Sequence, residues 1–196
     1  GISPLQDGKA CTYRIEAHPE KVELKWEEGT VTLAYADSDT LLISGRGKGA
    51  GIRLDFFPGE AFDFIQPVLS GKDTWYLADC FKNYMRYMLF NQAGRIALHQ
   101  EWKVSNSEFC QLDVLEENGE FLLVLEEVRD SWINRNISYD IQEVCRNARE
   151  DFDRFYQSMP SVPEEYEDAR EKAAYVNWSS IVNKLGLLKR DAMFMS

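Results

Sequence analysis

A glycine-rich segment, GRGKGAG at residues 45–51, contains the residue types that can cradle a phosphate group. In a phosphate-binding loop, backbone N–H groups and a lysine surround the anion, and the lysine is followed by Ser or Thr at the start of a helix. Here Lys48 is followed by Gly49, and residues 52–57 have the composition of a strand. We therefore expect a connection between strands at this point and no nucleotide site.

Paired carboxylates could act as acid and base if burial separated their pKa values. Three such pairs stand at residues 116–117, 126–127 and 164–165. Since the chain has 33 acidic residues, adjacent pairs arise by chance, and we expect these in turns or at helix starts. No Gly-x-Ser-x-Gly sequence is present, and neither His18 nor His99 has an obvious Ser or Cys partner. The sequence thus predicts no catalytic residue.

Tryptophan offers a different chemistry, because an indole ring can stack on the apolar C–H face of a sugar. The chain has five: Trp26, Trp75, Trp102, Trp132 and Trp178. An exposed tryptophan would indicate carbohydrate binding, whereas each one taken alone is better explained by packing in a core or at a domain interface.

The cysteines do not predict a metal site or any other cofactor. Cys11, Cys80, Cys110 and Cys145 are far apart, and no C-x-x-C pair is present. With only two histidines to add, no zinc site is expected. Scattered cysteines are typical of reduced thiols, so we expect a cytoplasmic protein. Secretion after removal of a signal peptide is the alternative.

Charge and hydropathy exclude two classes of partner. The formal net charge is -11, and the longest basic cluster is Lys189-Arg190, which is too short for the basic stripe that binds nucleic acid. No stretch approaches the roughly 18 apolar residues that span a bilayer, so no membrane partner is expected. The hydrophobic fraction of 44% is sufficient for a folded core.

Residues 11–130 alternate between apolar and polar in short runs, which is typical of half-buried strands. The runs at 22–26 and 31–35, around Glu28-Gly29, predict a hairpin, and Asp37-Ser38-Asp39 ends it. Two further hairpins are predicted at 84–100, around residues 91–94, and at 110–127, around 116–119. Eight to ten strands at this spacing predict two stacked antiparallel sheets, a β-sandwich.

After Asp130 the period becomes helical. Apolar residues from 141 to 155 predict a first helix, with Ser138 as N-cap and an end before Pro160. A capping box at residues 161–164 would start a second helix that ends at Gly186. One face of this helix is traced by Tyr166, Ala169, Ala173, Val176 and Ser180. This second helix is apolar on several sides, so we expect further helices around it.

The stretch from Asn147 to Ser196 resembles the start of the catalytic domain in glycoside hydrolases of the family 63 glucosidase type. The resemblance is carried by "AREDFDRFYQSMPSVPEEYEDAREKAAYVNWSSIV" and "GLLKRDAMFMS". In that group an N-terminal β-sandwich precedes an (α/α)6 barrel. The resemblance implies a β-sandwich at residues 1–137, followed at 138–196 by a helical pair that begins such a barrel.

The resemblance implies a parent enzyme that hydrolyses α-linked glucosides or related sugars with inversion, so its partner is carbohydrate. Arg190, Ser196 and Trp178 are the implied contacts to sugar. The family's catalytic carboxylates match no residue here, so the remaining barrel, missing from these residues, would supply them. The alternatives are a self-contained carbohydrate-binding or protein-interaction module, and a domain of a debranching-type or phosphorylase-like enzyme.

Overall fold

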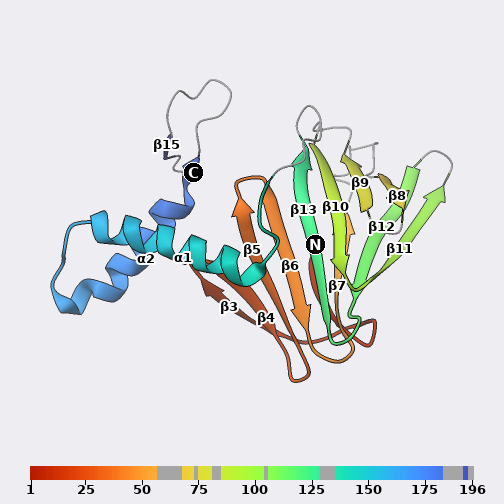
Figure 1. Ribbon diagram of the computed structural model, residues 1–196, viewed down its shortest axis with the longest axis horizontal. Coiled ribbons are helices and arrows are strands. Elements are labelled where there is room, and N and C mark those ends of the chain that lie inside the picture. Colours follow the sequence, from red (N-terminus) through yellow and green to blue (C-terminus); the bar gives the residue numbers. More distant parts are fainter. Residues whose placement is uncertain are drawn as a thin grey trace.

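Two antiparallel β-sheets face each other in the computed structural model, and two helices follow them (Figure 1). The structure describes residues 1–56, 68–72, 75–80, 85–103, 106–128, 136–182 and 192–193. Helix α1 lies against one sheet, and both helices extend sideways from it. The architecture confirms the predicted fold class, a mainly β protein in which a sandwich is followed by a helical pair.

The sheets have five and eight strands, in the orders β11-β12-β7-β1-β2 and β3-β4-β5-β6-β13-β10-β9-β8. The first contains β11 (Arg95–Lys103), β12 (Asn106–Leu115), β7 (Ala50–Phe56), β1 (Ile2–Gln6) and β2 (Lys9–Ala10). The second contains β3 (Arg14–His18), β4 (Lys21–Lys25), β5 (Thr30–Asp37), β6 (Thr40–Arg46), β13 (Glu120–Val128), β10 (Met85–Ala93), β9 (Trp75–Cys80) and β8 (Val68–Lys72). They hold more strands than the eight to ten predicted.

Beyond the sheets lie α1 (Ile141–Ser158), a 3₁₀ turn (Glu164–Tyr166), α2 (Glu167–Ser179) and the short pair β14 (Ile181–Val182) and β15 (Ala192–Met193). Neither α1 nor α2 is long and apolar enough to cross a membrane, and the described residues contain no other α-helix.

The space between the sheets is filled by every second residue of the strands, as the alternation predicts. The fully buried members of this core are Val31, Ile43, Ile52, Leu89, Leu112, Val114 and Leu123. Burying one such side chain stabilises the fold by about 1.5–3 kcal/mol. Apolar burial therefore holds the two sheets together.

The hairpin predicted around Glu28-Gly29 is confirmed: β4 and β5 pair antiparallel, with Leu24 opposite Val31. A Cβ atom on Gly29 would collide with the ring of Trp26, so a larger residue would displace the indole. The break at residues 37–39 is also confirmed, since β5 ends at Asp37 and β6 begins at Thr40.

The other two predicted hairpins are wrong, because each pair of strands is divided between the two sheets. Strand β10 pairs with β9 and β13, while β11 pairs with β12. Likewise β12 pairs with β7 and β13 pairs with β6. The turns themselves lie where the sequence predicts them, because Gly94, Asn118 and Gly119 adopt the positive φ of tight turns, 88°, 57° and 86°. A tight turn fixes where the chain reverses, but the burial of both faces of β13 decides its neighbours.

Helix α1 begins two residues later than predicted. Its N-cap is Asp140, which accepts a 2.9 Å hydrogen bond from the backbone N–H of Gln142. Ser138, the predicted cap, instead donates to Glu143 and accepts from the N–H of Asp140. The predicted end before Pro160 is confirmed.

Helix α2 differs from its prediction at both ends. The expected capping box is absent, since no side chain caps the helix start at Pro163, and a 3₁₀ turn comes before α2. The helix ends at Ser179, well before Gly186, which lies outside the described residues. Its buried residue is Ala174, whereas Tyr166, Ala169, Ala173 and Val176 are exposed. Most of the predicted apolar stripe is therefore exposed.

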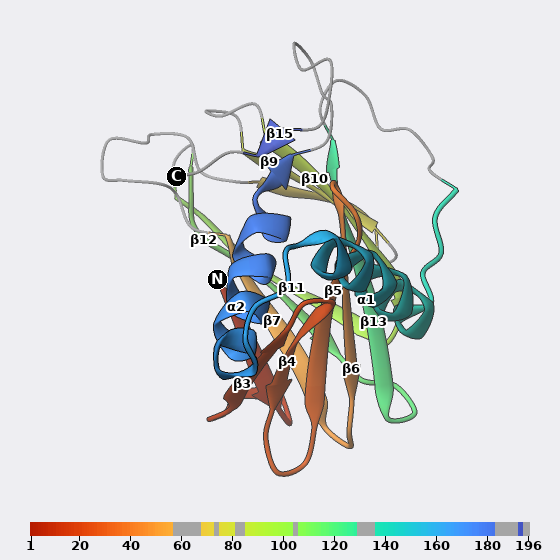
Figure 2. The same cartoon turned by 90° about the vertical axis from the view of Figure 1, so that its left-hand side faces the viewer.

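The first half of α1 covers the outer face of the eight-stranded sheet, where Ile141 and Val144 pack on Ala34, Leu42 and Val124. The second half continues beyond this contact, with α2 beside it (Figures 1 and 2). We call residues 149–180 the helical arm.

Candidate functional site

Of the three predicted sugar contacts, Arg190 and Ser196 lie outside the described residues. Trp178 is half-buried in the helical arm, where its Nε1 donates a 3.0 Å hydrogen bond to Oδ2 of Asp151. The hydrogen bond from Trp178, and to a smaller extent one from Arg154, lowers the pKa of Asp151. The indole also meets the ring of Phe152 edge-on at 5.7 Å between centroids. Trp178 thus ties α2 to α1, and its contact with sugar stays a prediction.

The glycine-rich segment forms the turn between β6 and β7, as expected. Glu116 accepts hydrogen bonds from the backbone N–H of Gly49 (3.0 Å) and Gly119 (2.6 Å). The bond from Gly49, and to a smaller extent the bond from Gly119, lowers the pKa of Glu116. The N–H of Gly49 therefore binds the chain's own carboxylate, so Glu116 is structural at this end of the sandwich.

The outer face of the β3–β4 hairpin carries a cluster that we call the charged hairpin: Arg14, Glu16, His18, Lys21, Glu23 and Lys25. Lys25 Nζ lies 2.6 Å from Glu16 and 3.2 Å from Glu23. Further pairs join Lys21 to Glu23 at 3.2 Å, Arg14 to Glu16 at 3.2 Å, and His18 to Glu23 at 3.7 Å. Arg149 of α1 approaches the connecting turn, 3.9 Å from Glu20.

Candidate ligand atoms of Glu16, His18 and Glu23 all lie within 4.8 Å of one another, a spacing that suits a divalent cation. Lys25 already neutralises the site: its hydrogen bond lowers the pKa of Glu16, and bonds to Glu16 and Glu23 raise its own pKa. Burial raises the pKa of Glu23, but bonds from Lys25 and Lys21 outweigh this and leave it lowered. These lysines fill the place of a cation, so the cluster is an ion-pair network.

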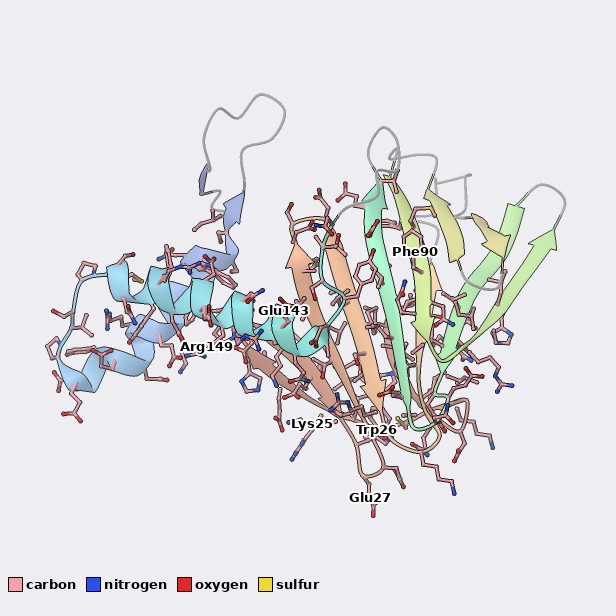
Figure 3. All side chains as sticks on the ribbon, in the orientation of Figure 1. Lys25, Trp26, Glu27, Phe90, Glu143 and Arg149 are labelled. Atoms are coloured by element: carbon pink, nitrogen blue, oxygen red, sulfur yellow. The ribbon has the colours of Figure 1, made fainter. Side chains whose placement is uncertain are left out.

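Beside this network lies a shallow, open depression of about 320 Å³, lined by Arg14, Lys25, Trp26 and Glu27. Figure 3 shows Lys25, Trp26 and Glu27 together at one end of β4. The indole Nε1 of Trp26 donates a 2.8 Å hydrogen bond to Gln6 Oε1, which fixes the ring. The depression places an indole ring beside charged side chains, of which Arg14 and Lys25 already pair with Glu16.

Sequence reasoning missed a second polar cluster, on the outer face of the five-stranded sheet. Arg53 binds both carboxylate oxygens of Asp113, each at 2.7 Å, and His99 Nε2 lies 3.3 Å from the same carboxylate. The bond to Asp113 raises the pKa of Arg53. The three residues come from β7, β12 and β11, so only strand register brings them together. Asp55 lies on the same face of β7, where its charge also raises the pKa of Arg53 and its carboxylate accepts a 2.7 Å hydrogen bond from Gln111. Both acids are therefore bound by neighbouring side chains.

The helical arm exposes large apolar side chains. The exposed fractions are 55% for Tyr166, 37% for Tyr175, 60% for Val176 and 36% for Ile181. We call these four residues the exposed face of the arm, including Ile181, which begins β14 directly after the arm. Where exposed apolar side chains gather into one patch, they mark an interaction site.

No protein-family model matches the chain, and no curated protein is similar to it. Among solved structures, a putative kojibiose phosphorylase from the human microbiome is similar, with a TM-score of 0.31 and 8% identity. The similarity covers 93% of this chain and 28% of that one, so the chain spans little more than a quarter of that protein's length. A TM-score of this size carries no argument about function.

Proposed function

We propose that this chain is a non-catalytic β-sandwich module of a carbohydrate-active enzyme, with the helical arm as the attachment point of a catalytic (α/α) barrel. The parent enzyme would hydrolyse α-linked glucosides or related sugars with inversion. In this arrangement the sandwich spans residues 1–137, and residues 138–196 begin the barrel.

The exposed face of the arm carries this proposal. Val176 is 60% exposed on a helix that is apolar on several sides, and the buried residue of α2 is Ala174. A helix of this composition is stable when neighbours cover it. A barrel built from further helices would supply such neighbours, which agrees with the resemblance of residues 147–196 to the start of such a domain.

The carboxylates support a non-catalytic role for the described part of the chain. Glu116 binds two backbone N–H groups, Glu16 and Glu23 pair with lysines, and Asp113 pairs with Arg53. Inverting hydrolysis needs an acid and a base roughly 6.5–9.5 Å apart across a sugar. In the proposal that pair lies in the barrel.

An assay of this chain on α-linked glucosides and mannosylglycerate tests the first half of the proposal. We expect no turnover, and turnover by these 196 residues alone would contradict it.

The second half of the proposal, the docking of a barrel on the arm, is tested by hydrogen exchange on this chain and on a polypeptide that continues the native sequence beyond Ser196. We expect amides of α2 to be slower in the longer protein, and equal rates would argue against a docked barrel.

The depression beside Trp26 favours a second candidate function, a self-contained carbohydrate-binding module. This candidate predicts saturable binding of a gluco-oligosaccharide in calorimetry. Glu27→Ala should weaken that binding because Glu27 lines the depression, whereas the adjacent Glu28→Ala serves as control. Absence of binding, or equal loss in both variants, would rule out this site.

A further inference from the structure

The eight-stranded sheet ends at β3, and in the described part of the chain the outer edge of β3 has no partner strand. Its five residues pair with β4 in unbroken register, from Arg14 opposite Lys25 to His18 opposite Lys21. Edges are usually protected by very short strands or by bulges. In the other sheet, β2 has two residues and β11 has a register shift at Glu101/Trp102. Strand β3 has neither protection. It does carry charged side chains, which also protect edges, but Arg14 and Glu16 have opposite signs, so a second copy can match them.

The free backbone groups of β3 belong to alternate residues. His18 and Lys21 flank a two-residue connection and form the last pair of the ladder. Such a pair is hydrogen-bonded, and hydrogen-bonded pairs alternate along an antiparallel ladder. The N–H and C=O groups of Arg14, Glu16 and His18 therefore face β4. The N–H and C=O groups of Ile15 and Ala17 therefore face outward. Ile15 is 64% exposed, and the side chain of Arg14 is 73% exposed. The edge is open to another strand.

We propose that β3 pairs with β3 of a second copy of this chain, antiparallel, about a two-fold axis at Ile15. The outward groups of Ile15 then bond those of the partner's Ile15, and Ala17 lies opposite the partner's Tyr13. The two eight-stranded sheets become one continuous sheet across the dimer. This surface does not depend on the proposed function.

Charge selects this register among the possible ones. With the axis at Ile15, Arg14 lies opposite the partner's Glu16, and the two-fold axis repeats this pair. An axis at Glu16 would place two glutamates opposite each other, and an axis at Arg14 would place two arginines together, both of which are unfavourable. An axis at Ala17 would bring Ile15 opposite Pro19, which has no N–H to donate.

The intrachain contacts of Glu16 are compatible with this pairing. Lys25 binds Oε2 of Glu16, and Arg14 of the same chain lies at Oε1, 3.2 Å away. In the dimer the arginine of the partner would share Oε1. Exposed ion pairs add little affinity, so the backbone bonds and Ile15 hold the dimer and the charges fix its register.

Sedimentation velocity of the purified chain over a wide concentration range tests the proposal. We expect a reversible monomer–dimer equilibrium. Ala17→Pro should abolish it, because proline removes an outward N–H while an edge strand tolerates proline there. Arg14→Glu should raise the dimer Kd by about tenfold or more through like-charge pairs. Arg154→Glu is the control, since Arg154 is equally exposed and also pairs with a carboxylate.

A mixing experiment tests the register itself. The Arg14→Glu and Glu16→Arg variants should each dimerise about tenfold or more weakly than the wild type, because like charges face each other in both homodimers. An equimolar mixture should form a heterodimer, since every facing pair is then of opposite charge. Circular dichroism confirms that each variant folds. A monomeric wild-type chain, a mixture that stays monomeric, or a dimer dissociated only by Val176→Lys in the arm would overturn the proposal.

Discussion

The sandwich and the helical arm are stabilised in different ways. In the sandwich, two sheets enclose a core whose central residues, such as Ile43 and Leu112, have no exposed surface. In the arm, Phe152 and Ala174 are the buried residues, and Val176 is uncovered. The sandwich therefore buries its apolar side chains between its own sheets, while the arm is held by a few contacts and leaves apolar side chains exposed.

Arg170 is the centre of the polar contacts in the arm. Its guanidinium lies 4.2 Å from the ring centroid of Tyr156 and pairs with Glu167 at 3.1 Å. It also donates to the carbonyls of Tyr156 (3.2 Å) and Met159 (3.1 Å). Helix α1 has no basic residue in its last turn, so Arg170 of α2 supplies the positive charge that favours a helix C-terminus.

The largest expected effect is in the sandwich. Phe121→Ala removes a ring that is 1% exposed and lies against Gly45, and we expect a loss of about 3–5 kcal/mol in the free energy of unfolding. Urea denaturation measures this loss. Tyr35→Ala is the control, because Tyr35 is 64% exposed and should change the free energy by about 0.5 kcal/mol at most. Equal losses would contradict the packing of Phe121 in the core.

Phe152→Ala should loosen the arm and leave the sandwich folded. The ring is 1% exposed and packs on Tyr156 and Trp178, so its loss should cost the arm about 3 kcal/mol. Hydrogen exchange should accelerate in α2 and in the second half of α1 but not in β6 or β13. Equal acceleration in the central strands would show that the two regions unfold together.

Arg170→Leu should have a smaller effect of the same kind. The substitution removes the donors to the α1 carbonyls and the pair with Glu167, so exchange should accelerate around residues 156–159. Arg170→Lys is an informative companion, because lysine keeps the charge but cannot make the planar set of bonds. If both variants exchange like the wild type, Arg170 does not hold the arm together.

Glu116→Gln should change how the stability of the sandwich depends on pH. Because the folded pKa of Glu116 lies below its ordinary value of 4.5, its carboxylate contributes stability above pH 4.5. That contribution is lost as the pH falls below 4.5 and through the folded pKa. The melting temperature of the wild type should therefore fall more steeply in this window than that of Glu116→Gln. Parallel curves would contradict the role of Gly49 and Gly119.

The smallest effect on stability is expected for Val176→Lys in the exposed face of the arm. Because Val176 is 60% exposed, the free energy of unfolding should change by about 0.5 kcal/mol or less. Binding of a hydrophobic dye should nevertheless decrease. A large destabilisation would show that Val176 is covered in solution and that the arm is not an open surface.

Much of the fold could be predicted from local patterns. Alternation located the strands around Glu28-Gly29 and the sandwich class, and Pro160 marked the end of α1. These features depend on backbone geometry and on which face of an element is apolar, both of which neighbouring residues specify. Of the candidate site residues, Trp178 could be placed on a helix, but its partner Asp151 could not be foreseen.

Tertiary structure decided which strands pair and which surfaces stay open. The turns at Gly94 and at Asn118-Gly119 were predictable, yet each joins different sheets, because burial on both faces of β13 outweighs local reversal. Contacts between distant positions, such as Asp113 with Arg53 and Arg170 with the end of α1, follow from register and helix packing. The spacing of Tyr166, Ala169, Ala173 and Val176 showed an apolar stripe, but only the position of α1 determined that this stripe is uncovered.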